Sequence, residues 1–385
     1  MAATPLTQKE AVVITTNRAP MQVAVPADAK AAAGTKQKVL TYSFASLKEM
    51  VASDERAEYL VQSLIRTDSV SLIVGDSGIG KSPFLYEMGI AVAAGKDFLH
   101  FKTNRTKVVY VDMENGLRQV ERIAQRVSKH LGLESVPENF QFAVGDSICN
   151  DFDLGKMLMK EKRGLVIIDT LRSFKTEAEC KSTSSATFLK QLRGLARTHG
   201  CAFVVVHHLK KPSKEFPGPA LEDCPVLEWL NEASGSRALV NQTDTRIALA
   251  RPKRTNAGTG EDSYEVALVM KSNTRVEGDY GPLFVARDFD PDGEPIGYRL
   301  LTGAELLPND DYRKTFAALP AEFRFTDAKR VLGKSDSSTD NFLHRCIELR
   351  LIVKEAGRYR KCQTGKDTVE TRPPGDRFNL AAEAA

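Results

Sequence analysis

The stretch "SLIVGDSGIGKSPFLYEMG", residues 71–89, decides the fold class of this chain. Its first residues are apolar and lead into a loop in which Gly75, Gly80, Lys81 and Ser82 fit the phosphate-loop spacing G-x-x-x-x-G-K-S/T. Glycines let backbone N–H groups turn around a polyphosphate, and a lysine places a charge on its β- and γ-phosphates. The spacing therefore predicts a nucleotide-binding loop between a strand and a helix.

The expected nucleotide contacts are the loop and the first helical turn after it. The Ser82 hydroxyl is expected to bind Mg²⁺, and the helix that begins near Gly80 directs its positive end at the phosphates. A proline at position 83 is compatible with that helix, because the first turn needs no hydrogen bond from it. The predicted set is Gly75, Asp76, Ser77, Gly78, Ile79, Gly80, Lys81, Ser82 and Pro83. The alternative is an ordinary glycine turn between a strand and a helix.

The composition of the chain indicates a globular protein. A length of 385 residues predicts two or three domains, and 42% hydrophobic with 27% charged residues is ordinary for this class. The net charge of +4 is a small surplus over 54 basic and 50 acidic residues, so it indicates no partner by itself. The six cysteines form no C-x-x-C pair, and no apolar stretch approaches the ~18 residues that span a bilayer. These features favour a reduced, cytoplasmic location without a membrane partner.

Apolar runs alternate with amphipathic stretches over residues 41–300, which predicts an α/β fold with a mostly parallel sheet. Strands are expected at 107–115, 140–146, 164–174 and 201–211, and helices at 43–65, 117–131 and 185–200. From residue 236, the stretches "RALVNQTDTRIALARPKRT", "SYEVALVMKSN" and "GPLFVARDF" are typical of further strands at the far edge of the sheet. The segments 1–40 and 363–385 are expected to be flexible tails.

A different pattern begins near residue 308. Three short helices and a hairpin that turns at 356–357 predict a winged helix-turn-helix domain over residues 308–362. Residues 324–361 hold ten Lys or Arg against five Asp or Glu, which favours contact with duplex DNA. A protein-contact module is the alternative. The candidate DNA contacts are Ser337, Ser338, Thr339 and Asn341 on the recognition helix and Arg358, Arg360 and Lys361 on the wing.

Acidic residues end two of the predicted strands. Asp169 ends "GLVIIDT", where a carboxylate would lie beside Mg²⁺, although an acid can also simply terminate a strand. "VVYVDMEN" ends with Asp112 and Glu114, two residues apart and therefore on the same side of a strand. We prefer Glu114 as the general base, because its longer side chain reaches further towards an attacking water. Asp112 is the alternative base, and a third interpretation is that neither acts.

A histidine pair, His207-His208, ends the strand "VVVHHLKK". A zinc site is not expected, because no Cys or carboxylate ligands occur at zinc spacing. One of the two is expected to sense the γ-phosphate by hydrogen bonding, and the sequence does not separate them. The alternative is a pair of structural histidines.

Several stretches together resemble the RecA-like ATPases of the plasmid RepA hexameric helicase type. They are "LIVGDSGIGKS", "AVAAGKDF", "VVYVDMENG", "LVIIDTLRSF", "VVVHHLKK", "SGSRALVNQTDTRIAL" and "VMKSN", over roughly residues 43–290. The resemblance implies a RecA-like core in a homo-oligomeric ring, a hexamer, with ATP and Mg²⁺ between subunits and single-stranded DNA in the channel. It assigns residues 75–82 to the phosphates, Glu114 to water activation and Asp169 to Mg²⁺. His208 falls near the sensor position.

The resemblance also points to Arg246, in "QTDTRIAL", as an arginine finger supplied to the neighbouring subunit. A planar, permanently charged guanidinium is suited to stabilising transition-state charge. The alternative is a strand arginine in a surface salt bridge. Lys271 and Arg275 are further candidates. Family members often carry Arg-Gly-Ser where this chain has residues 234–236, so the arginine of that motif is either displaced to Arg237 or lost.

The long loop at 209–236 is expected to face the channel, where Lys210, Lys211 and Lys214 would bind a phosphate backbone. A solvated loop is the alternative. These features predict an ATP-hydrolysing, DNA-associated motor, a helicase or replication ATPase of a plasmid, phage or mobile element. Two alternatives remain, namely a regulatory or recombination ATPase that does not unwind DNA and an ATP-gated DNA-binding regulator.

Overall fold

The computed structural model describes residues 43–52, 59–144, 164–174, 182–209, 219–232, 237–252, 266–307, 309–349, 351–355 and 357–362. The chain divides into two compact units, residues 1–55 and 56–385. In the first unit, the described element is α1 (Phe44–Ala52), where Ser43 Oγ accepts the Ser46 N–H at 3.1 Å. The segments expected to be tails, 1–40 and 363–385, lie outside the described residues.

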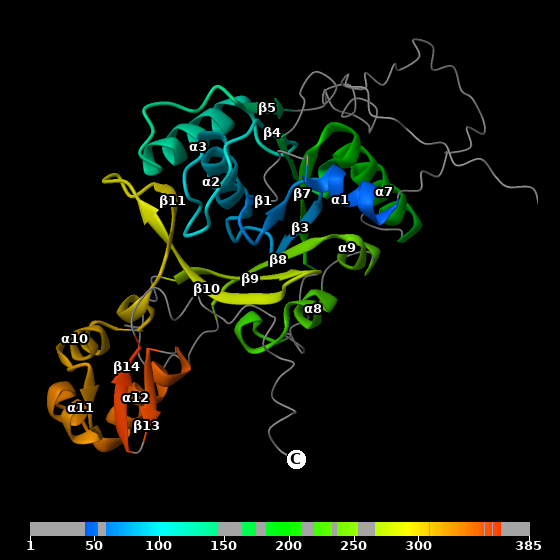
Figure 1. Cartoon of the computed structure of the whole chain (residues 1–385). Helices are drawn as coiled ribbons and strands as arrows, with labels where there is room; N and C mark the ends of the chain where they lie inside the picture. Colours follow the sequence, from blue (N-terminus) through cyan, green and yellow to red (C-terminus); the bar gives the residue numbers. More distant parts are fainter. Residues whose placement is uncertain are drawn as a thin grey trace, which may run out of the picture. The chain divides into compact units, whose positions relative to one another are not determined.

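A nine-stranded sheet forms the centre of the second unit (Figure 1). Five of its eight strand pairings are parallel, and the three at the β11 end are antiparallel. The α/β fold with a mostly parallel sheet and further strands at its far edge is therefore confirmed. In spatial order the strands are β11 (Pro295–Leu300), β10 (Gly278–Phe289), β9 (Val266–Thr274), β8 (Thr245–Ala250), β3 (Val70–Gly75), β7 (Cys201–His208), β6 (Gly164–Asp169), β4 (Val108–Asp112) and β5 (Phe140–Val144).

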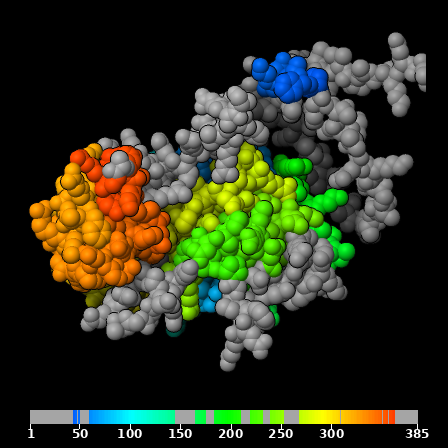
Figure 2. Space-filling view, turned by 90° about the horizontal axis from the view of Figure 1, so that it is seen from below, coloured from blue at the N-terminus to red at the C-terminus, as the bar shows by residue number. Residues whose placement is uncertain are grey.

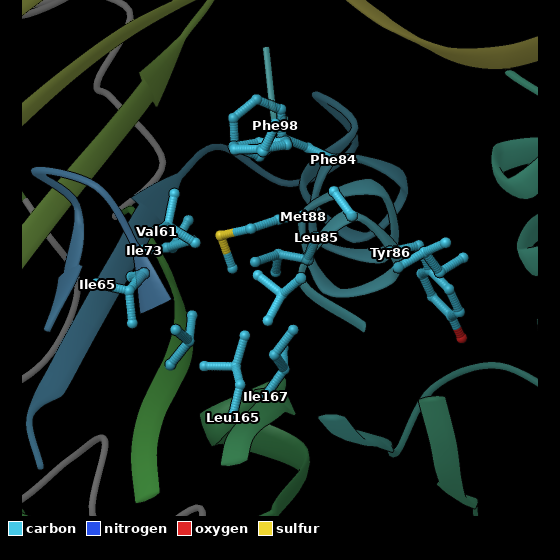
Figure 3. Close-up of a cluster of buried hydrophobic side chains, with 14 of the residues drawn as sticks. Val61, Ile65, Ile73, Phe84, Leu85, Tyr86, Met88, Phe98, Leu165 and Ile167 are labelled. Atoms are coloured by element: carbon cyan, nitrogen blue, oxygen red, sulfur yellow. The ribbon is translucent and has the colours of Figure 1, made fainter. Parts of the chain in front are cut away.

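Both faces of the sheet are buried, because side chains of a strand alternate between the two faces. On β3, Ile73 packs in the core cluster that includes α2 and α3, whereas Leu72 and Val74 pack in the cluster that includes α5 and α7. Figure 3 shows the first cluster, in which side chains of α2 meet those of the strands. The helices are α2 (Lys81–Ala94), α3 (Leu117–His130), α5 (Leu171–Phe174), α7 (Ser182–His199), α8 (Val226–Trp229) and α9 (Arg237–Gln242), with short 3-10 helices at Leu221–Asp223 and Leu230–Glu232.

Helix α8 packs beside the antiparallel edge of the sheet. The Val226 N–H donates to Asp279 Oδ2 at 3.3 Å, and Trp229 is buried in the same cluster as Val269 of β9. Figure 2 shows this region, where the green surface of α8 adjoins the yellow-green surface of the edge strands. In the part of the chain that the structure describes, every helix is too short or too polar to cross a membrane.

The strand expected over 164–174 ends at Asp169, and Leu171–Phe174 form α5. Two further secondary-structure predictions are wrong. The helix expected over 43–65 ends at Ala52, and β1 (Tyr59–Val61) and β2 (Ile65–Arg66) form a hairpin instead. Val61 and Ile65 have helical spacing, but both insert into the core from the hairpin, and Ser63 between them has a left-handed φ of 58°. Residues 237–242, expected to be part of a strand, form α9. Long-range burial and side-chain bonds override the local pattern at both places.

The β10–β11 edge packs on α2 through a buried carboxylate. Glu87 of α2 is 1% exposed, and its Oε2 accepts the Tyr298 N–H at 2.7 Å. His130 of α3 lies 3.8 Å from Glu87 Oε1. Burial raises the pKa of Glu87 to about 8; the bond from Tyr298 lowers this pKa and nearby Asp288 raises it, both to a smaller extent.

We expect the free energy of unfolding to fall as the pH rises from about 4.5 to about 8, because Glu87 releases its proton on unfolding within this range. Glu87→Gln should weaken this fall, since an amide accepts the same Tyr298 N–H and does not ionise. Glu121→Gln, an exposed change on α3, is the control and should leave the pH dependence unchanged. Thermal unfolding at pH 5.5 and pH 8 measures the effect. An unchanged pH dependence in Glu87→Gln would remove Glu87 as its source.

Residues 303–362 form three helices and a three-stranded antiparallel sheet around their own core. The elements are Gly303–Leu306, a 3-10 helix, followed by α10 (Asp310–Ala318), β12 (Glu322–Phe323), α11 (Phe325–Leu332), α12 (Asp336–Glu348), β13 (Ile352–Glu355) and β14 (Arg358–Lys361). Phe316, Phe342, Cys346 and Tyr359 are buried together. These elements coincide with the three helices and hairpin expected from the sequence, while DNA recognition by them stays a prediction.

Two of the residues predicted to contact DNA in this region have hydrogen bonds within the domain. Thr339 is fully buried, and its hydroxyl donates to Ser335 O at 2.9 Å within α12. Lys361 Nζ donates to Leu319 O at 2.5 Å and lies 4.7 Å from the centre of the Phe316 ring. The prediction for Thr339 is therefore wrong, because packing turns this side chain inward. Lys361 is half-buried, and a DNA contact by it stays a prediction. Ser337 and Arg358 are exposed.

Candidate nucleotide-binding site

The phosphate loop joins β3 to α2, as the sequence predicts. β3 ends at Gly75 and α2 begins at Lys81, so the helix directs its amino end and its free N–H groups into the loop. Gly78 and Gly80 have left-handed φ values of 75° and 100°, which other residues adopt only at a cost. The loop therefore has the local backbone that phosphate binding requires.

The Lys81 side chain lies inside the loop and is 5% exposed. Its Nζ donates to Gly75 O at 3.0 Å and to Asp76 O at 2.6 Å, and it lies 3.1 Å from His208 Nδ1. Burial lowers the pKa of Lys81, and the nearby carboxylates of Asp169, Asp76 and Glu114 oppose that effect. These carboxylates favour the charged form of Lys81 at the centre of the site, where the phosphates of a nucleotide would replace the two carbonyl oxygens.

The structure separates the two histidines at the end of β7. His207 is 1% exposed, whereas His208 is half-buried beside Lys81. An ammonium group has only donors, so His208 Nδ1 accepts from it, and the imidazole then carries its proton on Nε2. Burial lowers the pKa of His208, and Lys81 lowers it further. A neutral imidazole with an N–H donor at the phosphate loop has the chemistry of a phosphate sensor.

Asp169 ends β6 and fits the role of a magnesium ligand. Its Oδ2 accepts the Tyr110 hydroxyl at 2.6 Å, while its buried Oδ1 has no hydrogen-bond partner within the described residues. Burial raises the pKa of Asp169, and the hydroxyls of Tyr110 and Ser82 lower it. Ser82 and Asp169 would hold Mg²⁺ together with phosphate and water oxygens, as this ion prefers. No group of three or more His, Cys, Asp or Glu within the described ranges forms a separate metal site.

The environment of the two candidate bases differs sharply. Asp112 is fully buried, and its oxygens accept the Tyr86 hydroxyl at 2.6 Å and both the N–H and the side-chain amide of Asn115. Glu114 is exposed and close enough to Lys81 to affect its pKa. Asp112 therefore holds the turn after β4, and Glu114 is the carboxylate that can meet a water at the phosphate loop.

Two hydroxyl residues that orient Glu114 were not predicted from the sequence. Thr170 Oγ1 and Ser173 Oγ donate to Glu114 Oε1 at 2.9 and 3.1 Å. Arg172 lies close enough to lower the pKa of His208, as a smaller contribution than that of Lys81. All three follow Asp169 directly in "DTLRS", so their position after a strand-end carboxylate was the available signal. They bring hydroxyl and guanidinium groups to the same edge of the sheet.

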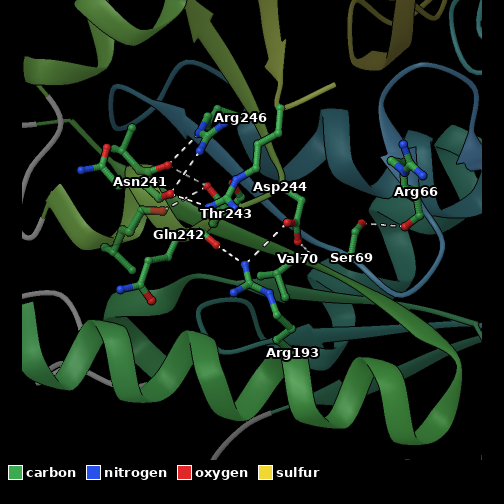
Figure 4. A network of polar contacts seen from close by, with 12 residues as sticks. Arg66, Ser69, Val70, Arg193, Asn241, Gln242, Thr243, Asp244 and Arg246 are labelled. Atoms are coloured by element: carbon green, nitrogen blue, oxygen red, sulfur yellow. Dashed lines mark hydrogen bonds and ion pairs between the residues drawn. The ribbon is translucent and has the colours of Figure 1, made fainter. Parts of the chain in front are cut away.

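Arg246 does not have the environment expected of an arginine finger. It is 5% exposed, and its guanidinium donates to Val240 O at 2.7 Å, to Asn273 Oδ1 at 3.2 Å and to Asn241 O at 3.4 Å (Figure 4). It lies at the start of β8. The assignment of Arg246 as a finger therefore disagrees with its contacts, which hold the carboxyl end of α9 against the sheet.

Among the other cation candidates, Arg275 is the exposed one. Lys271 is 8% exposed and its Nζ donates to Cys224 O at 2.6 Å, so it too is engaged in the interior. Arg275 follows β9, and its guanidinium donates to Thr243 O at 3.0 Å and to Asn241 O at 2.6 Å while the residue stays exposed. The side chain of Arg237, the segment 234–236 and the lysines at 210, 211 and 214 lie outside the described residues.

Comparison with protein families places this site in a known class. Residues 37–214 match the family described as AAA domain. The AAA-domain match contains the phosphate loop, Glu114, Asp169 and His208, and it ends before β8, Arg275 and the C-terminal helices. It covers less than half of the chain and supports a P-loop ATPase domain with ATP and Mg²⁺ as its ligands.

Proposed function

We propose that this protein is an ATP-hydrolysing, DNA-associated motor whose ATPase sites are completed between subunits of a ring. The observation that carries the proposal is a division of charged groups between two edges of one sheet. Lys81, Glu114, Asp169 and His208 gather at the carboxyl edge within the AAA-domain match, whereas the exposed Arg275 lies at the amino edge.

The strand register gives the separation of the two edges. β3 and β8 are parallel and pair Gly75 with Leu249 at the carboxyl edge, while β9 pairs Thr274 with Thr245 at the amino edge. A strand from Val70 to Gly75 extends roughly 16 Å. Arg275 therefore faces away from its own phosphate loop. A head-to-tail contact between subunits would bring it to a neighbour, and such contacts form a ring when the rotation between subunits closes.

In this proposal each residue has one role in phosphoryl transfer. The loop N–H groups and Lys81 bind the phosphates, Glu114 takes the proton of the attacking water, and His208 donates to the γ-phosphate. Arg275 of the neighbouring subunit stabilises the charge that develops in the transition state. When bound, Mg²⁺ at Ser82 and Asp169 neutralises phosphate charge.

The DNA-directed part of the proposal rests on the resemblance to RepA-type helicases and on the charge of residues 303–362. Several exposed cations there are paired, such as Lys329 with Asp336 at 2.7 Å and Lys334 with Asp311 at 2.8 Å. Exposed pairs contribute little stability, so DNA phosphates can compete for these cations. We therefore favour a hexameric helicase or replication ATPase of a plasmid, phage or mobile element, with single-stranded DNA in the ring and duplex DNA at the C-terminal helices.

The decisive experiment measures ATP turnover with and without single-stranded DNA, together with the mass of the assembly under ATP. We expect the protein to form a ring, and we expect single-stranded DNA to stimulate its ATP turnover. Lys81→Ala, which removes the charge from the loop, serves as the inactive control. A ring without stimulation would favour a regulatory or recombination ATPase. A monomer that binds duplex DNA only with ATP would favour a gated regulator, and a chain without turnover would contradict the proposal.

A further inference from the structure

A tyrosine from the far edge of the sheet contacts the phosphate loop directly. The Tyr298 hydroxyl, on β11, donates to Gly80 O at 2.9 Å, across 218 positions of sequence. A Cβ atom at Gly80 would overlap both this hydroxyl and Arg287 Nη2, so only glycine permits the approach. Gly80, the last residue of the loop, therefore leaves space for a side chain from a distant part of the sequence.

Contacts of both its backbone and its side chain hold Tyr298 in place. Its backbone N–H donates to Glu87 and its carbonyl lies 3.2 Å from His130 Nε2, while its ring packs edge-on against Phe84 at 5.6 Å. The side chain is buried at 2% exposure. Because Gly80 directly precedes α2 and Phe84 and Glu87 lie in its first two turns, the tyrosine has one rigid position relative to the loop.

Arg287 of β10 supports the hydroxyl. It is the cross-strand partner of Tyr298; its Nη2 donates to the Tyr298 hydroxyl at 2.8 Å, and its guanidinium carbon lies 5.3 Å from the ring centre. Its Nε is buried and has no partner within the described part of the chain. With the guanidinium as donor, the hydroxyl directs its own proton at Gly80 O.

The bond to Gly80 O has a consequence for phosphate binding. A peptide bond is planar and trans, so the Gly80 carbonyl and the Lys81 N–H point in opposite directions. Gly80 O also accepts the Phe84 N–H at 3.2 Å, the first hydrogen bond of α2, so the carbonyl points along the helix and the Lys81 N–H points back towards the loop. The Tyr298 hydroxyl adds a second bond that holds the peptide in this orientation. The N–H groups of such a loop are the groups that cradle phosphates.

We propose that Tyr298, supported by Arg287, is a positioning residue that orients the Gly80–Lys81 peptide for phosphate binding. The proposal rests on the proposed ATPase function. It adds a contribution from the antiparallel edge, outside the AAA-domain match, to the nucleotide affinity of the same subunit.

The test replaces only the hydroxyl. In Tyr298→Phe the KM for ATP and the Kd for MgADP should rise about 2–10-fold, the value of one hydrogen bond, while kcat stays near that of the wild-type protein. Tyr280→Phe, on β10, is the matched control, because it loses one hydroxyl bond, to His100 Nε2 at 2.9 Å, away from the loop. It should leave both constants unchanged. Melting without nucleotide shows that both variants are folded.

Arg287→Ala provides an independent variant at a half-buried position and should weaken MgADP binding in the same direction. If the wild-type protein binds MgADP, and Tyr298→Phe and Arg287→Ala bind it with the same affinity, the inference is wrong while the proposed function stands. A change in kcat without a change in Kd would also overturn it. If the wild-type protein itself fails to bind MgADP, the proposed function fails and the inference fails with it.

Discussion

Arg275→Ala should bind ATP with near wild-type affinity and hydrolyse it about 10³–10⁵-fold more slowly, the contribution typical of an arginine supplied in trans. The expectation follows from its place at the amino edge of the sheet, where it cannot reach its own phosphate loop, and from its exposure. Equilibrium binding of MgATP and single-turnover hydrolysis by the assembled protein measure the two quantities. Hydrolysis at the wild-type rate would show that Arg275 only braces α9.

Arg246→Ala is the comparison for that result. Removing its buried guanidinium removes its hydrogen bonds to Val240 O and Asn273 Oδ1, so the main loss should be in melting temperature. Mixing Arg275→Ala with Glu114→Gln gives a further test. Some interfaces then pair an intact base with an intact arginine, so part of the activity should return. If the two proteins co-assemble and no activity returns, the site is not shared between subunits.

Glu114→Gln should bind ATP normally and turn it over about 10²–10⁴-fold more slowly, the range that a general base contributes. Glutamine keeps the length of the side chain and can still accept from Thr170 and Ser173, so the loss is that of the proton acceptor. Nucleotide affinity and the hydrolysis rate are measured on the same preparation.

Asp112→Asn is the matched control for Glu114→Gln. This change replaces an acceptor-only carboxylate by an amide whose NH₂ group meets the donors of Tyr86 and Asn115, so it should lower the stability of the fold. Folded Asp112→Asn protein should keep most of its turnover per active subunit. Normal turnover in Glu114→Gln together with lost turnover in folded Asp112→Asn would reverse the assignment of the base.

Local pattern was sufficient for the parts of this protein that depend on neighbouring residues. The phosphate loop, the strand that precedes it and the helix that follows it are encoded within residues 71–89, because glycine spacing and apolar runs act over a few residues. The carboxyl-edge positions of Asp169, Glu114 and His208 also followed from strand ends, since parallel strands end at one edge. The α/β class followed from the same alternation.

Tertiary structure decided which of the similar candidates can act. Asp112 and Glu114 are two residues apart, yet only the fold buries the first and exposes the second. Arg246 is of the residue type expected for an arginine finger, but its guanidinium is bound to carbonyl oxygens of α9 in the interior. Arg275 also binds a carbonyl of α9 and stays exposed. The bond from Tyr298 to Gly80 joins residues 218 positions apart. Burial and hydrogen-bond partners depend on contacts between distant segments, and no local pattern of residues records those contacts.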